Sequence, residues 1–175
     1  MIKLGIDIVD LKDPQLKERN ERALQLILNP KDELIEHPQL YWLLWSAKEA
    51  IFKSEREAIN FSPSSIPVKL SKNGETIVFS SQKSEGIIEV TEQYILATCS
   101  SEGTKVVHEA IATDTIATSQ DVRAYIVDYF KNKGLEYTVG ADDLNLPTIL
   151  PQNVPISISH HRHWSAFAYP ESITE

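Results

Sequence analysis

The chain has 175 residues, of which 42% are hydrophobic and 24% charged, a composition ordinary for a single globular domain spanning residues 1–175. Its net charge of −8 argues against nucleic-acid binding, and the lack of any run of about 18 apolar residues predicts no membrane span. Because Cys99 is the only cysteine and the N-terminus has no signal-peptide pattern, we expect a cytoplasmic protein without an internal disulfide.

The first predicted element is a strand near the N-terminus. Apolar residues alternate with others from Ile2 to Ile8, and this period of two places the isoleucines on one face. Asp7 then points to the opposite face, where the neighbouring Gly5 is expected to leave space for a ligand. A carboxylate on such an element must be hydrated, paired or bound to a metal. The alternative is an Asp7 that accepts backbone hydrogen bonds at the end of a strand.

A helix is predicted after this strand. The pair Asp13-Pro14 suits a helix start, so we expect a helix from Pro14 to about Leu28. This segment could present a basic patch on an otherwise acidic protein, although a solvated helix face explains it equally well. The basic residues in and beside it are Lys12, Lys17, Arg19 and Arg22.

A second helix is expected over about Gln39 to Ala58, a stretch without internal glycine or proline and rich in strong helix formers. Trp45, Glu49 and Lys53 recur at intervals of four residues and therefore share one face of this helix. A Glu–Lys pair at this spacing is usually a surface ion pair of small energetic effect. Here the surrounding helix is largely apolar, which weakens that interpretation.

The remainder of the chain predicts strands and one more helix. Alternating patterns predict strands at 67–70, 76–80, 87–90, 94–99 and 105–111, and shorter ones at 136–139, 155–159 and 165–169. A helix is predicted over 120–133, and a surface loop over 142–154. Strands and helices grouped unevenly in this way predict an α+β fold with mainly antiparallel sheet.

Three motifs together resemble a known family. They are Gly5-Ile6-Asp7, the run Trp45-Ser46-Ala47-Lys48-Glu49-Ala50-Ile51-Phe52-Lys53, and Ser157-Ile158-Ser159-His160. Their order and spacing resemble the 4′-phosphopantetheinyl transferase superfamily, and most closely its short, holo-acyl-carrier-protein-synthase type. The resemblance implies the fold of that family, in which helices pack on an antiparallel sheet.

The resemblance also implies roles for individual residues. Asp7 and Glu49 would bind Mg²⁺, and Lys53 would bind phosphate, which suits the charge neutralisation that phosphoryl transfer requires. Lys48, Ser159 and His160 would bind coenzyme A (CoA). A solvated Lys48 and a surface imidazole at His160 are the alternatives. The histidines at 160, 161 and 163 also allow a zinc site, which the lack of a nearby cysteine makes the weaker interpretation.

The activity implied is transfer of 4′-phosphopantetheine from CoA to a serine of an apo acyl or peptidyl carrier protein. Short-type relatives form trimers, so a homotrimer is a further expectation, with Ser159 and His160 facing the Asp7 and Glu49 of a neighbour. The longer type has two halves in one monomer, and 175 residues with one copy of each motif predict that this chain does not.

Two departures from the short type keep other functions open. The segment after the second helix, residues 57–63, has no glycine, and the usual Gly-Lys-Pro or Gly-Arg-Pro element is replaced by Asn145-Leu146-Pro147. Both departures lie where the nucleotide of CoA would be contacted. They motivate the alternative of a catalytically inactive relative that binds CoA or a carrier protein. A different metal-dependent phosphotransferase is a third hypothesis.

Overall fold

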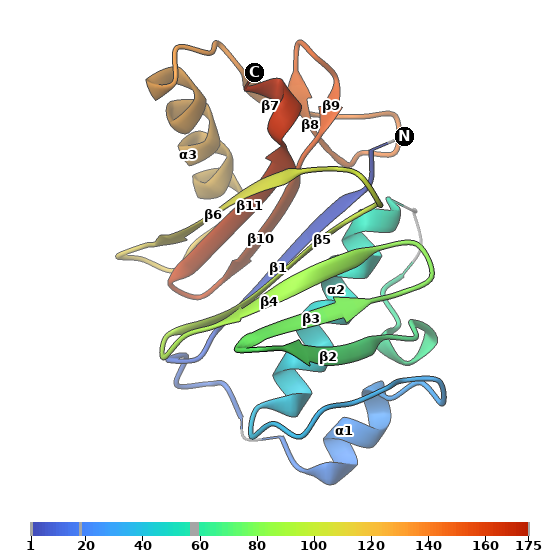
Figure 1. The fold of residues 1–175 in the computed structure, drawn as a ribbon. Helices are drawn as coiled ribbons and strands as arrows, with labels where there is room; N and C mark the ends of the chain where they lie inside the picture. Colours follow the sequence, from blue (N-terminus) through green and yellow to red (C-terminus); the bar gives the residue numbers. More distant parts are fainter. Residues whose placement is uncertain (1, 18, 57–59, 175) are drawn as a thin grey trace.

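The computed structural model describes residues 2–17, 19–56 and 60–174, and these ranges form an α+β structure of antiparallel sheets with helices packed against them (Figure 1). The helices are α1 (Glu21–Ile27), α2 (Leu40–Glu55) and α3 (Ser119–Asn132). The strand orders are β1-β5-β4-β3-β2, β10-β11-β6 and β7-β8-β9. The strands are β1 (Leu4–Asp10), β2 (Lys69–Asn73), β3 (Thr76–Ser80), β4 (Glu85–Val90), β5 (Tyr94–Ser100), β6 (Val106–Ala112), β7 (Thr138–Ala141), β8 (Pro147–Leu150), β9 (Val154–Pro155), β10 (Ser157–His161) and β11 (Trp164–Pro170).

The predicted fold class is confirmed, as are the positions of most elements. The largest error concerns the first helix, which begins at Glu21 with Asn20 as its cap and not at Pro14. The Asp13 carboxylate accepts a hydrogen bond from the amide of Gln15 in a turn that does not continue into a helix, and it also binds Arg162 and His161 from the other end of the chain. The predicted loop over 142–154 is also wrong, since it contains β8 with the fully buried Ile149. The second helix ends at Glu55, and its predicted last residues, 57 and 58, lie outside the described residues.

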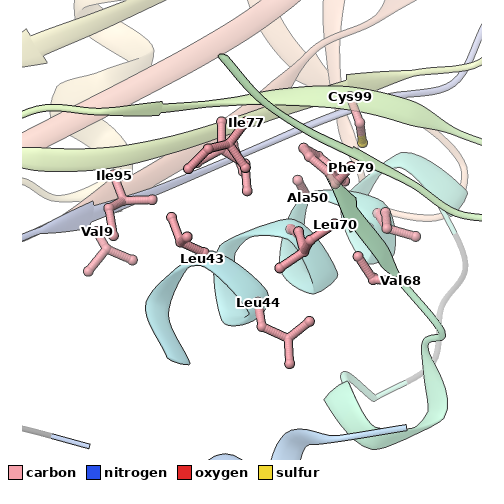
Figure 2. Packing of buried hydrophobic residues seen from close by; sticks show 14 of the residues in the cluster. Val9, Leu43, Leu44, Ala50, Val68, Leu70, Ile77, Phe79, Ile95 and Cys99 are labelled. Atoms are coloured by element: carbon pink, nitrogen blue, oxygen red, sulfur yellow. The ribbon is translucent and has the colours of Figure 1, made fainter. Parts of the chain in front are cut away.

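The main hydrophobic core lies between α2 and one face of the five-stranded sheet (Figure 2). Leu43, Leu44 and Ala50 of the helix meet Leu70 and Phe79 of the strands, and each of these side chains is at most 3% exposed. Full burial of one large apolar side chain stabilises the folded state by about 1.5–3 kcal/mol. This core therefore fixes α2 firmly on the sheet.

Gly5 allows α2 to approach β1 closely. A Cβ atom at this position would lie 1.9 Å from the carbonyl oxygen of Ala50 and 2.9 Å from the amide nitrogen of Ser54. Any side chain would therefore collide with the backbone of the helix. The prediction that the glycine leaves space for a ligand is wrong, because the helix backbone fills that space.

The order of elements in the first part of the chain is repeated in the second. The sequence β1, α2, hairpin β2–β3, hairpin β4–β5 is followed by β6, α3, hairpin β7–β8, hairpin β10–β11. In each half the last strand pairs antiparallel with both the first strand and its hairpin partner. The prediction that 175 residues are too few for two halves is therefore wrong.

The two halves meet in a small apolar core of their own. Ile6, Ile8 and Leu96 of the first half pack against Ala166 of the second, and each is at most 2% exposed. Tyr94 and Trp164 occupy the first position of β5 and of β11, and their rings contact each other with centroids 4.5 Å apart and planes tilted by 55°. These apolar contacts hold the two halves together.

Candidate active site

Asp7 lies in the middle of β1, on the strand face that packs against α2. The flanking Ile6 and Ile8 are buried on the other face, as the alternation predicted. Asp7 is only 4% exposed. Its Oδ1 accepts hydrogen bonds from Ser159 Oγ at 2.9 Å and from Lys53 Nζ at 3.1 Å. Its Oδ2 is buried and has no hydrogen-bond partner among the described residues.

Lys53 joins the two carboxylates that the sequence singled out. Its Nζ lies 3.1 Å from Asp7 Oδ1 and 3.2 Å from Glu49 Oε1, and it also donates to the carbonyl oxygen of Ile6 at 3.1 Å. The predicted helical face therefore exists, and it is directed at β1. One ammonium group shared by two carboxylates leaves the cluster with one negative charge.

Trp45 holds the second carboxylate in place. Its indole Nε1 donates a hydrogen bond to Glu49 Oε2 at 3.0 Å, one helical turn away. The Glu49 side chain remains 27% exposed, so a ligand can reach it. The sequence placed Trp45 on this face, but its role as a hydrogen-bond donor follows only from the side-chain geometry.

The electrostatic state of the cluster follows from its burial. Burial has the largest effect on Asp7 and raises its pKa above the ordinary value; Lys53 acts against this, and Glu49 adds to it. Burial by itself would lower the pKa of Lys53, but the two carboxylates outweigh burial and raise it. Lys53 is therefore charged at neutral pH, whereas ionising Asp7 costs more free energy than it would in water.

Side chains of β10 hydrogen-bond to the free backbone edge of β1. The amide of Ile6 donates to Ser157 Oγ at 3.0 Å, and the amide of Ile8 donates to Ser159 Oγ at 3.3 Å. The amide of Asp10 donates to His161 Nδ1 at 2.9 Å. This side-chain ladder, with rungs at 157, 159 and 161, replaces backbone pairing between the two halves. It also brings Ser159 to Asp7 of the same chain, so that contact requires no neighbouring subunit.

The turn after β10 is clamped to the loop after β1. Asp13 Oδ2 lies 3.1 Å from His161 Nε2, and Asp13 Oδ1 lies 2.8 Å from Arg162 Nε. Asp10 is 1% exposed and accepts hydrogen bonds from the amides of Lys12 and His163. Asp10 therefore holds the loop, and Arg162 is engaged by Asp13.

The cluster opens into a cavity of about 530 Å³ between the two halves. Asp7, Glu49, Lys53, Ser159 and His160 all line this cavity. Partial burial has the largest effect on His160 and lowers its pKa, and the charge of Lys53 lowers it further. The His160 imidazole is consequently neutral at neutral pH and can act as a hydrogen-bond donor or acceptor rather than as a cation.

Lys48, the remaining predicted CoA ligand, is not in this cavity. Its side chain is 0% exposed, and Nζ donates to the carbonyl oxygens of Ile27 and Pro63 and to Asp32 Oδ2, at 2.8, 3.0 and 2.7 Å respectively. These bonds use all three ammonium hydrogens. Lys48 therefore connects α2 to the end of α1 and to two loops. Neither a CoA contact nor a solvated lysine agrees with this placement.

The second half has no equivalent set of charges. Glu109 is the fourth residue of β6, the position that Asp7 has in β1. Its Oε1 accepts a hydrogen bond from Tyr129 of α3 at 3.1 Å, in the place where Lys53 of α2 meets Asp7. A phenol carries no positive charge and cannot neutralise phosphate. Among the described residues, the Asp7 cluster is therefore the candidate site, and the Glu109–Tyr129 pair is not.

The residues present fit a divalent cation. Asp7 Oδ2 is an unpartnered buried carboxylate oxygen, and Glu49 offers a second, partly exposed carboxylate close by. Mg²⁺ typically takes one or two carboxylates and completes its shell with water and phosphate oxygens. The described residues contain no group of three or more histidine, cysteine or acidic side chains placed to hold a metal, which also argues against the zinc interpretation of the histidines.

Comparison with known families agrees with this geometry. The model of the 4′-phosphopantetheinyl transferase superfamily matches residues 3–99, which include β1, α2 and the whole first sheet. The match covers more than half of the chain, and the protein belongs to this superfamily. Comparisons with curated proteins and with solved structures gave no match. No helix of the described residues is long and apolar enough to span a membrane.

Proposed function

We propose that this protein transfers the 4′-phosphopantetheine group of CoA to a serine of an apo acyl or peptidyl carrier protein, with Mg²⁺ as cofactor. One observation carries the proposal. Asp7, Glu49 and Lys53 form a partly buried charged cluster in a cavity of about 530 Å³ that Ser159 and His160 also line. Phosphoryl transfer depends on positioning and charge neutralisation, and this cluster supplies both.

In the proposed reaction, the serine oxygen of the carrier attacks the phosphorus that bears pantetheine. A serine–phosphorus bond forms, the phosphoanhydride bond breaks, and adenosine 3′,5′-bisphosphate leaves with the bonding electrons. Glu49 takes the serine proton, and Lys53 neutralises the leaving phosphate. Asp7 and Glu49 would hold Mg²⁺, which lowers the charge on the pyrophosphate when bound.

Lys53 must change its partner for this to happen. Without substrate its Nζ contacts both carboxylates, at 3.1 and 3.2 Å. Bound Mg²⁺ would give the two carboxylates a new partner, and the pyrophosphate would give the Lys53 ammonium group a new anion. The side chain is 23% exposed, so it can turn toward the cavity without unfolding the helix.

The carrier protein is expected to dock beside α1. Of the four basic residues noted in the sequence, Arg22 lies on α1, and Lys12, Lys17 and Arg19 lie in the preceding loop. The Arg19 guanidinium lies 5.2 Å from the ring centroids of both Tyr41 and Trp42, which keeps it beside the cavity. These cations suit an acidic carrier even though the whole chain is acidic.

The proposal is tested by intact-mass measurement. Apo carrier proteins from fatty-acid, polyketide and peptide synthesis are incubated with the protein, CoA and Mg²⁺. A mass gain of one phosphopantetheine that does not occur when EDTA is present supports the proposal and identifies the carrier. CoA binding without transfer to any carrier would favour an inactive relative. Indifference to CoA together with turnover of another phosphate compound would favour a different phosphotransferase.

A substitution in the cluster tests the role of its central carboxylate. Glu49→Gln keeps the size of the side chain and the acceptor for Trp45 but removes the negative charge. Transfer should fall by at least about 100-fold while the circular dichroism spectrum stays unchanged. Glu171→Gln, in the 3-10 turn near the C-terminus, is the matched control and should transfer normally. Near-normal turnover by Glu49→Gln would contradict the assigned role.

A further inference from the structure

Arg56 ends the catalytic helix in an unusual conformation. It follows Glu55 of α2 and has a φ of 52°, in the left-handed region that helices usually enter with a glycine. A residue with a side chain pays a conformational cost there and needs compensating contacts. This arginine directly precedes the segment 57–63, which has no glycine.

Contacts with the second half hold the Arg56 side chain. Nη2 lies 2.6 Å from Asp142 Oδ2 and 3.4 Å from Thr148 Oγ1, and Nη1 donates to the carbonyl oxygen of Pro147 at 3.2 Å. The side chain is only 10% exposed. Asp142 is itself fixed, because its Oδ1 accepts hydrogen bonds from the amides of Leu144 and Leu146. The hairpin β7–β8 therefore orients the guanidinium.

Arg56 lines a cavity that adjoins the active-site cavity. A second cavity, of about 230 Å³, is lined by Arg56, Lys53, Pro147 and Ile158, among others. Lys53 and Ile158 also line the active-site cavity, so the two spaces adjoin at these residues. A ligand whose pyrophosphate lies at Lys53 would extend toward Arg56 if it followed these adjoining cavities.

Arg56 still has donors to offer. A guanidinium has five N–H groups, and the bonds to Asp142, Thr148 and Pro147 use three of them. The other two, Nε–H and one on Nη1, have no partner among the described residues. A guanidinium can bind a carboxylate on one side and a phosphate on the other, because its donors spread across a plane.

We propose that Arg56 binds the 3′-phosphate of CoA, an assignment that rests on the proposed function of the site. In this arrangement Lys53 takes the pyrophosphate and Arg56 takes the phosphate at the far end of the nucleotide. Asp142 positions the guanidinium. The Asn145-Leu146-Pro147 segment has no lysine or arginine. In this arrangement Arg56, at the end of α2 in the other half of the molecule, supplies the positive charge.

The test compares two variants that break the same ion pair. Calorimetric titrations with CoA and with dephospho-CoA, which lacks the 3′-phosphate, are made on the wild type, Arg56→Gln and Asp142→Asn. Arg56→Gln should weaken CoA binding by about 10- to 100-fold and leave dephospho-CoA binding within about twofold. Asp142→Asn also removes the ion pair, but it keeps the guanidinium and should keep the preference for CoA.

The outcomes separate this proposal from its alternatives. An Arg56→Gln variant that still prefers CoA to dephospho-CoA would overturn it. Equal losses of CoA affinity in both variants would show that the ion pair only joins the two halves, and would also overturn it. A wild type that binds no CoA would overturn this proposal and the proposed function together. A wild type that binds CoA but modifies no carrier would overturn the proposed function alone, because the binding comparison still decides the role of Arg56.

Discussion

Gly5 is the residue whose substitution tests the architecture of the site most directly. In Gly5→Ala the new Cβ would start 1.9 Å from the carbonyl oxygen of Ala50, whereas ordinary contact begins at 3.4 Å. The difference, 3.4 minus 1.9, requires α2 and β1 to separate by about 1.5 Å, because the obstacle is backbone and cannot rotate away. Overpacking of this kind costs about 1–3 kcal/mol. At about 2–4 °C per kcal/mol, the melting temperature should fall by about 2–12 °C.

The same displacement should also reduce catalysis. Lys53 Nζ contacts Asp7 Oδ1 and the carbonyl oxygen of Ile6, both at 3.1 Å, across the interface that would widen. A misplacement of about 1 Å in a catalytic group can cost about 100-fold in rate. We therefore expect transfer per folded molecule to fall by about that factor, measured by the mass assay at a temperature where the variant remains folded.

Gly86→Ala is the matched control for this experiment. Its Cβ would lie 2.3 Å from the carbonyl oxygen of Thr98 and 2.6 Å from the ring of Phe79, so it is also overpacked. Gly86 belongs to β4, which contributes no residue to the site cavity. It should lower the melting temperature without changing turnover per folded molecule. Normal turnover in Gly5→Ala, or an equal loss in Gly86→Ala, would refute the reasoning.

Three further predictions concern the charges around the site. Burial raises the folded-state pKa of Asp7, so its contribution to stability is present below the unfolded pKa of about 4 and is lost as pH rises through the folded pKa. The Asp7→Asn variant should therefore gain stability relative to the wild type as pH rises toward neutrality, measured by urea titrations, and it should lose transfer. A stability difference that does not change with pH would contradict this. Lys48→Met leaves the buried Asp32 carboxylate unpaired and should cost about 3–5 kcal/mol in urea unfolding, partly restored by adding Asp32→Asn; a loss below about 1 kcal/mol would show that the pair is not structural. Trp45→Phe removes the donor to Glu49 and should lower kcat about 10-fold with little change in the KM for CoA; an unchanged kcat would show that Glu49 needs no such support.

The parts of the site that the sequence predicted are those fixed by local periodicity. Alternation along β1 placed Asp7 opposite the isoleucines, and the helical repeat placed Trp45, Glu49 and Lys53 on one face. Each of these inferences depends on residues a few positions apart, for which backbone geometry leaves little choice.

The errors came from contacts between distant parts of the chain. Asp13 has the spacing of a helix cap, but Arg162 recruits its carboxylate from 149 residues away. Lys48 sits beside Glu49 in the motif, yet its partners are Asp32 and two backbone carbonyls that no local pattern identifies. The second half repeats the arrangement of strands without repeating the motifs, as Glu109 in the position of Asp7 shows. The single copy of each motif therefore gave no sign of the second half.

The side-chain ladder between β1 and β10 has a consequence for behaviour at low concentration. Ser157, Ser159 and His161 come from the same polypeptide as the strand they bind. The two walls of the cavity therefore assemble in a unimolecular step, at an effective concentration set by the connecting chain. A site shared between separate subunits would empty on dilution below their dissociation constant. For this protein the Ser159–Asp7 junction should persist at picomolar concentrations, because both residues belong to one chain.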